Sequence, residues 1–294
     1  MKNLNKIVAE AFAIEAEEAR QAGALSYMAR PLTQATMPHS RKEGSSFERQ
    51  NGAFSMSITA HPRFGLPYGS YPRLVLAWLT TEAVRTRSPE LELGQTFSGF
   101  MAELGLTPTG GRWGTISRLR DQIKRLLTAS VWCVYDTDDQ TTGQGFQIAE
   151  KFDLWWEPQT PEQAGKWKST VTLGSQLFEE ILAHPIPVDS RALRGLKRSP
   201  MAVDIYCWLT YRMSYLRKQT TIPWEALQMQ FGADYATDKR GYRDFKRKFL
   251  KHLHAVQVLY PKVRVEETAS GLTLRPSPTH VVHRSPRDQK VIHA

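Results

Sequence analysis

The sequence predicts an α+β fold that is mainly α, made of two tandem winged helix-turn-helix domains related by internal duplication. Its 294 residues suit two domains of ordinary size. Short motifs recur in the same order, since Trp78-Leu79-Thr80 returns as Trp208-Leu209-Thr210 and Leu104-Gly105 corresponds to Phe231-Gly232. Three apolar positions of a third element also correspond: Leu119, Ile123 and Leu127 with Phe245, Phe249 and Leu253.

The predicted elements follow one order in both copies. Apolar residues at helical spacing predict helices over 73–85 and 201–216, each followed by a short strand at 91–93 or 221–222. A brief helix over 96–104 or 224–231 then ends at a glycine turn. A long basic helix comes next, over 112–129 or 239–255, and each copy ends in a hairpin: 131–135 with 145–148, and 263–265 with 272–274. This order is typical of a winged helix-turn-helix.

Changes in composition predict the domain boundaries. Residues 1–60 are expected to form a flexible N-terminal arm with a possible helix, because turn formers and polar residues dominate after Pro31. The first winged-helix domain is placed at 61–158 and the second at 166–275, separated by a proline-containing linker at 159–165. Residues 276–294 are expected to be a disordered basic tail.

Composition limits the function classes. A net charge of +10 and a pI near 9.6 favour a polyanionic partner, with nucleic acid ahead of an anionic membrane surface. The longest apolar run, 74–79, is too short to cross a bilayer, and the N-terminus lacks a secretory signal, so a cytoplasmic location is expected. Cys133 and Cys207 give neither a disulfide framework nor a zinc motif, and we expect no cofactor and no metal.

The excess charge falls on the third helix of each copy. Residues 112–125 hold five basic residues and one acid, a net of +4, and residues 239–251 hold seven and one, a net of +6; together they equal the +10 of the whole chain. Basic helix faces are often only solvated surface, but two at corresponding places indicate a DNA-binding footprint. The candidate DNA-binding residues are Arg112, Ser117, Arg118, Gln122, Arg125, Lys239, Arg240, Arg243, Arg247, Lys248 and Lys251.

The two copies are not expected to contribute equally. The first hairpin turn carries Asp136, Asp138 and Asp139, which DNA phosphates would repel, and its basic helix is the less charged. We therefore expect the second copy to dominate DNA affinity, with the first adding contacts or serving in a homodimer. All eight tryptophans lie in or beside segments rich in apolar residues, so core packing is expected for each.

Several strings resemble the plasmid-encoded RepA replication initiator family. They are Gly65-Leu66-Pro67-Tyr68-Gly69-Ser70-Tyr71-Pro72-Arg73, the following Leu76 to Val84, Thr109-Gly110-Gly111-Arg112-Trp113-Gly114 and Arg118-Leu119-Arg120. The resemblance implies a bacterial cytoplasmic protein that binds repeated sequences, or iterons, in the double-stranded DNA of a plasmid origin. It also implies that the protein helps open the origin and recruits the host initiator and replicative helicase. Related initiators bind repeats as monomers and repress their own genes as dimers.

Two alternatives remain beside a non-enzymatic initiator. A transcriptional repressor with the same fold would have the same DNA chemistry, and replication of an origin plasmid in trans would distinguish the two. A nicking initiator is suggested by His252-Leu253-His254 with Tyr260 downstream. However, the two histidines fall on a predicted helix, about 200° apart, where they could not share a metal. No phosphate-binding loop ending in Lys-Ser or Lys-Thr supports ATP-driven melting.

Overall fold

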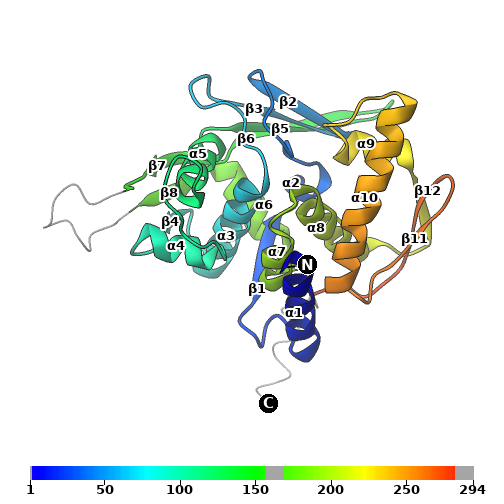
Figure 1. Ribbon diagram of the computed structural model, residues 1–294. Coiled ribbons are helices and arrows are strands. Elements are labelled where there is room, and N and C mark those ends of the chain that lie inside the picture. Colours follow the sequence, from blue (N-terminus) through cyan, green and yellow to red (C-terminus); the bar gives the residue numbers. More distant parts are fainter. Residues whose placement is uncertain (1, 157–168, 282–294) are drawn as a thin grey trace, which may run out of the picture.

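The structure is a computed structural model that describes residues 2–156 and 169–281 (Figure 1). Over these residues the chain forms ten helices and four small sheets, a mixed α/β architecture.

Both halves of the chain follow the predicted order of elements. In the first half it is α3 (Ser70–Thr86), β4 (Glu90–Glu92), α4 (Phe97–Glu103), α5 (Thr115–Leu127), β5 (Ser130–Asp136) and β6 (Thr141–Gln147). In the second half it is α8 (Pro200–Tyr215), β10 (Thr220–Pro223), α9 (Trp224–Phe231), α10 (Lys239–Leu259), β11 (Arg264–Glu267) and β12 (Gly271–Arg275). The predicted helices and hairpins are confirmed, with α5 at the left of Figure 1 and α10 at the right.

Side-chain caps fix where several of these helices begin. The Asp238 carboxylate accepts a hydrogen bond from the Gly241 amide at 2.7 Å at the start of α10, and Thr96 accepts one from the Gly99 amide at the start of α4. Ser199 caps α8, where Pro200 occupies the first turn. These residues supply acceptors to amides that have no partner inside the helix, which is why the predicted starts are close to the observed ones.

The sheets of the two halves differ. In the second half, β10, β12 and β11 form one antiparallel sheet in that order, so the short strand joins the hairpin as in a winged helix. In the first half, β4 pairs instead with β8 (Thr170–Leu173), which also pairs with β7 (Ala149–Asp153). The equal order of elements therefore does not give equal sheets.

Residues 25–59 contain regular secondary structure, so the expectation that they belong to a flexible arm is wrong. After α1 (Lys2–Ala16), β1 (Leu25–Ala29) precedes the short α2 (Pro31–Gln34), and a hairpin of β2 (Ser46–Asn51) and β3 (Phe54–Thr59) follows. β3 pairs with β5, so the first half carries the four-stranded sheet β2-β3-β5-β6 along the top of Figure 1. The two-residue turn is Gly52-Ala53, between the paired Asn51 and Phe54, and Gly52 at φ 61° occupies its first position, where glycine is favoured.

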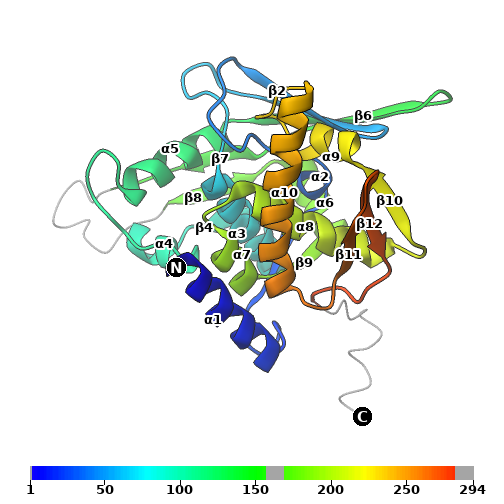
Figure 2. The same ribbon diagram turned by 45° about the vertical axis from the view of Figure 1, so that its right-hand side comes forward.

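The predicted domain boundary is crossed by strand pairing. The linker at 159–165 lies outside the described residues, but β8 beyond it belongs to the sheet of the first half. Next come α6 (Ser175–Ala183), β9 (Pro185–Asp189) and α7 (Ser190–Leu196), and β9 pairs with β1. Helix α1 packs against α7 and α10 (Figure 2). The N-terminal region is therefore built into both halves.

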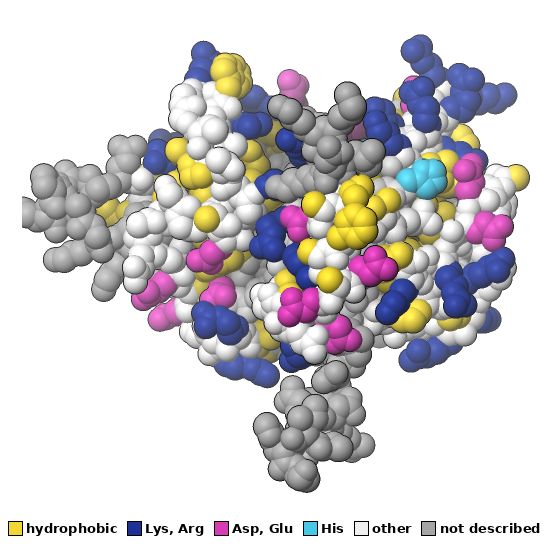
Figure 3. All heavy atoms as spheres, turned by 60° about the horizontal axis from the view of Figure 1, so that its bottom comes forward, with side chains coloured by type: hydrophobic (Ala, Val, Ile, Leu, Met, Phe, Trp, Pro, Cys, Tyr) yellow, Lys and Arg dark blue, Asp and Glu magenta, His cyan; other side chains and the backbone are white. Residues whose placement is uncertain are grey.

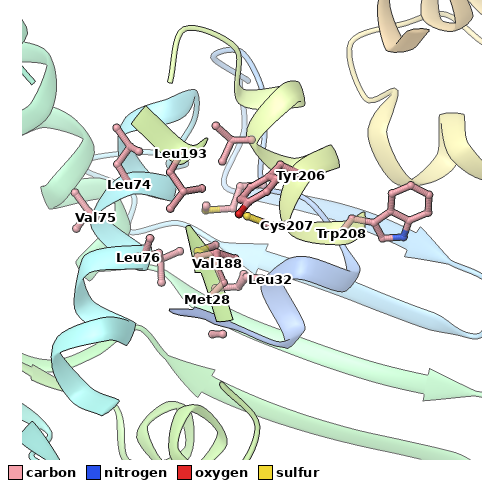
Figure 4. Close-up of a cluster of buried hydrophobic side chains, with 14 of the residues drawn as sticks. Met28, Leu32, Leu74, Val75, Leu76, Val188, Leu193, Tyr206, Cys207 and Trp208 are labelled. Atoms are coloured by element: carbon pink, nitrogen blue, oxygen red, sulfur yellow. The ribbon is translucent and has the colours of Figure 1, made fainter. Parts of the chain in front are cut away.

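One contiguous hydrophobic core runs through the described residues of both halves. In its centre, Met28, Leu76, Val188, Leu193 and Tyr206 lie close together although they come from β1, α3, β9, α7 and α8 (Figure 4). The two halves that the sequence predicted as separate domains thus share one core.

A buried ion pair also joins the halves. Arg73 on α3 is 1% exposed and donates to both carboxylate oxygens of Asp204 on α8, at 2.6 and 2.7 Å. It also donates to the carbonyls of Met37 and Gly69, and the His39 ring contacts Asp204 at 2.8 Å. Burial by itself would raise the pKa of the Asp204 carboxyl, but Arg73 and His39 hold that pKa below its ordinary value.

Part of the predicted tail is ordered against the second half. The His280 ring stacks on Tyr260 with centroids 4.8 Å apart, and its Nδ1 lies 2.7 Å from the Tyr206 hydroxyl. The prediction of a disordered tail is therefore wrong for the residues just before 282. Residues 282–294 lie outside the part of the chain that the structure describes.

Candidate nucleic-acid interface

Helix α10 is amphipathic, with an apolar face in the core and a cationic face in solvent. Phe245, Phe249, Leu253 and Val256 are buried at helical spacing. All six predicted DNA-binding residues of this helix are exposed: Lys239, Arg240, Arg243, Arg247, Lys248 and Lys251. In Figure 3, Lys and Arg side chains gather at the upper right, on the side of the molecule that carries α10 in Figure 1.

The acidic residues near the cationic face of α10 are too few to neutralise its positive charge. Asp244 pairs with Arg247 at 2.8 Å, and both side chains are exposed. Arg240, Arg243 and Arg247 line one shallow surface depression with Asp244. Lys246 lies at the border of this face and contacts protein groups: its ammonium pairs with Glu267 at 2.9 Å and lies 4.7 Å from the Trp224 ring centroid. A surface of exposed guanidinium and ammonium groups suits phosphates and guanine edges.

The predicted residues of the first basic helix are divided between surface and interior. This helix begins at Thr115, so Arg112 lies on the loop before α5; Arg112, Ser117 and Arg118 are exposed, as predicted. Gln122 is buried, and Arg125 has only 13% of its side chain exposed, so the expectation that both face outward is wrong.

The segment before α3 covers that flank of α5. Gln122 accepts a hydrogen bond from the Tyr68 amide at 2.8 Å, and Arg125 donates to Asp121 at 2.8 Å and to the Leu66 carbonyl at 3.3 Å. Gly65, at φ 79°, lies so close that an added Cβ would be 2.9 Å from a guanidinium nitrogen of Arg125. Both side chains therefore hold the segment 65–68 in place instead of facing solvent.

Four residues lie at the surface where the sequence did not predict them. Trp113 is 78% exposed and lies on the loop before α5, whereas core packing had been expected; Trp132 on β5 is also exposed, at 55%. Lys197 and Arg198 lie in the turn between α7 and α8 and line one groove with Arg118. Neither lies on a basic helix, so the charge count gave no signal for them.

The hairpins differ in charge as the sequence indicates. Asp136, Asp138 and Asp139 are exposed at the turn between β5 and β6. The turn of the second hairpin has no acid at Ser270-Gly271, and an added Cβ at Gly271 would approach the Ile222 carbonyl oxygen to 2.0 Å. Close approach of two strands therefore requires glycine there.

The residues of the nicking alternative do not form a site. His252 and His254 lie on α10, and burial together with Lys251 and Lys248 lowers the pKa of His252 to about 4. Tyr260 is fully buried, donates a hydrogen bond to the Pro278 carbonyl, and has its pKa raised by burial. A nucleophile must reach the phosphodiester, and this hydroxyl is enclosed.

Within residues 2–156 and 169–281, no group of three or more His, Cys, Asp or Glu side chains is arranged to hold a metal ion. In the same part of the chain, none of the helices has the length and apolar character needed to span a membrane.

Comparisons with known proteins indicate the family to which the chain belongs. The family described as plasmid encoded RepA protein matches residues 66–226, more than half of the chain. A crystal structure of SeMet derivatives of domain 2 and domain 3 of RctB is similar in fold, with a TM-score of 0.53 and 12% identity over 85% of this chain and 99% of that chain. No curated protein gave a match. The resemblance seen in the sequence is confirmed, and the protein belongs to the family of plasmid encoded RepA proteins.

Proposed function

We propose that this protein is a plasmid replication initiator that binds repeated double-stranded sequences at its origin through α5 and α10. The observation that carries the proposal is the six exposed cations of α10, presented by a helix whose opposite face is fixed in the core. Such a helix fits a major groove, where side chains reach base edges and phosphates together. Membership of the plasmid encoded RepA family supports the same role.

The geometry supports tandem winged helices as the DNA-binding units. The second half has the three-helix order and the sheet β10-β12-β11 of a winged helix, and the first half repeats the order of elements with a rearranged sheet. We infer that the two units derive from one duplicated plan. The first unit, with Arg112 and Arg118 as its exposed predicted cations, makes the smaller contribution to affinity.

We also propose that the protein helps to open the origin and recruits a host initiator and helicase. This role is non-enzymatic and takes place in the bacterial cytoplasm. The fully buried Tyr260 supports the view that strand cleavage is not part of the activity. A homodimer that represses transcription is the second state we infer from the family.

A footprint on the DNA that flanks the gene tests this function. Simultaneous binding by α5 and α10, about one helical turn apart, should protect a repeat of about 20 base pairs. Protection of half that length would contradict binding by both helices. The protein should also support replication of an origin plasmid in trans, whereas a repressor alone would bind the site and fail to do so.

A further inference from the structure

An exposed tryptophan projects from the loop that precedes α5. Trp113 is 78% exposed, and the Arg112 guanidinium lies 5.2 Å from its ring centroid. The large exposed area means that this ring contributes little to the stability of the fold. One face of the indole is thus covered by a cation while the ring as a whole stays accessible to a ligand.

Hydrogen bonds hold this loop in one conformation. The amides of Thr109 and Thr115 each donate to the hydroxyl of the other residue at 2.9 Å, and the Thr115 hydroxyl donates to the Thr107 carbonyl at 2.7 Å. The Ser117 hydroxyl donates to the Gly111 carbonyl at 2.8 Å, which ties the loop to the first turn of α5. The ring is therefore presented by a preformed loop, and binding to it need not first order the backbone.

A groove lined by cations and aromatic rings adjoins the same loop. It measures about 800 Å³, and Thr107, Thr109 and Thr115 of the loop form part of its wall. The rest of its lining includes Tyr68, Tyr71, Arg118, Lys197, Arg198 and Asp121. Asp121 is engaged by Arg125 at 2.8 Å, Lys197 donates to the Gly105 carbonyl, and Arg198 is exposed. The groove therefore carries a net positive charge beside the aromatic loop.

We propose that Trp113 and this groove form a binding site for single-stranded DNA. A flat, exposed ring gains most contact from another flat face, and a base offers its face only when it is unstacked from its neighbours. A cationic groove that follows the sugar-phosphate backbone beside such a ring is the usual composition of single-strand sites. In a duplex, both faces of each base are covered, so Trp113 would meet only base edges or the backbone.

This inference extends the proposed function, because an initiator that binds duplex repeats would also hold one strand of the opened origin. The two ligands depend mainly on different residues. Duplex binding is assigned mainly to the exposed cations of α10, and single-strand binding to Trp113 and Arg198, while Arg118 contributes to both. A probe with no repeat sequence and no second strand therefore tests the single-strand site by itself.

The test measures binding of a labelled oligothymidylate of about 15 nucleotides and of a duplex origin repeat to the full chain, by fluorescence anisotropy. We expect Trp113→Ala to weaken oligothymidylate binding by about fivefold or more, since base stacking on one aromatic side chain is worth about 1–3 kcal/mol. Trp113→Phe should retain most of the binding. Duplex affinity of both variants should stay within about twofold, a change that corresponds to roughly 0.4 kcal/mol.

Trp132→Ala is the matched control, because Trp132 is an exposed tryptophan on β5 outside the loop and groove. It should leave oligothymidylate binding unchanged. Arg198→Glu should weaken it and reduce its salt dependence. The proposal is overturned if Trp113→Ala binds the oligothymidylate as wild type does, or if this variant loses duplex affinity to the same extent. Failure of wild type to bind the duplex repeat, with single-strand binding intact, would instead contradict the proposed function.

Discussion

Arg125 and Arg118 lie two turns apart on one helix, yet their surroundings differ completely. Arg125 is fixed by Asp121, by the Leu66 carbonyl and by the Tyr68 ring, whose centroid is 5.5 Å from the guanidinium carbon. Arg118 is exposed beside Tyr71. Position on a helical wheel cannot separate the two, because the segment that covers Arg125 lies far away in the sequence.

Replacing Arg125 should therefore affect stability, whereas replacing Arg118 should affect DNA binding. Arg125→Ala should lower the free energy of unfolding by about 1–2 kcal/mol, since it removes charge-assisted bonds in a covered site, and should leave duplex affinity of the folded protein unchanged. Arg118→Ala should change stability by less than about 0.5 kcal/mol and should weaken DNA binding. Urea unfolding and anisotropy titration on the same samples measure both quantities. Equal losses of stability would contradict the structure at Arg125.

His280 predicts a dependence of stability on pH. Burial lowers the pKa of its imidazole to about 4, below the value of about 6.5 expected when unfolded. Because the unfolded chain then binds the proton more readily, the stabilisation is fully present above pH 6.5 and is lost as the pH falls toward 4. His280 alone should account for a loss of about 3 kcal/mol over that window.

The variant His280→Phe tests this dependence, since it keeps a ring against Tyr260 and removes the titrating group. Denaturant unfolding between pH 7 and pH 4 should show a shallower loss for the variant than for wild type. His252 titrates over the same window and should supply the remaining slope. Identical pH profiles for wild type and variant would exclude His280 as a source.

At the level of elements, local patterns determine most of what could be predicted. Helices α8, α9 and α10 begin and end near the predicted residues because apolar spacing and side-chain caps are local signals. Pairing of β1 with β9 and of β8 with β4 depends on contacts between distant segments, which periodicity does not report. The hairpin of β2 and β3 could have been predicted, because Gly52 begins a two-residue turn between two short strands, a local signal.

The same distinction applies to the candidate site. The cationic face of α10 follows from the sequence alone, since its apolar residues repeat at helical spacing. Burial of Gln122 on α5, and the exposure of Trp113, depend on how other segments fold over or away from the helix. Lys197 and Arg198 join the basic surface only through the meeting of the two halves.

Helix α10 should dominate duplex affinity. Lys251→Ala should weaken binding of a duplex repeat and reduce the slope of log affinity against log salt by about one, as expected for the loss of one phosphate contact. Lys151→Ala, which removes an exposed lysine on β7, serves as the control and should leave the slope unchanged. A slope for Lys251→Ala equal to that of wild type would show that this side chain does not contact the backbone.

At the scale of the whole molecule, the buried pair of Arg73 and Asp204 links α3 to α8 and so helps to fix the orientation of the two halves. Asp204→Asn leaves the guanidinium without its counter-charge and should lower the free energy of unfolding by about 3–5 kcal/mol. Thermal unfolding of the variant measures its stability, and a DNA footprint recorded at low temperature, where the variant is folded, tests the orientation of the two halves. A footprint of the same length as that of wild type, together with unchanged stability, would show that the ion pair is dispensable.

The acid dependence of this pair has a defined sign. Because the folded pKa of Asp204 is depressed, its stabilisation is present above the pKa of the unfolded carboxyl, about 3.9, and is lost as the pH falls below it. Wild type should therefore lose stability in that acidic range more steeply than Asp204→Asn. Parallel acid unfolding curves for the two proteins would contradict the depressed pKa.

The pairing of β1 with β9 has a consequence for biosynthesis. Leu25 faces Asp189 across this ladder, so a strand made early on the ribosome must wait for a partner translated much later. Until then, Met28 and the apolar residues around it have no place to bury, and the nascent chain depends on chaperones or on rapid completion. A gene fragment that stops before β9 should accordingly yield aggregated polypeptide, however intact the upstream elements are.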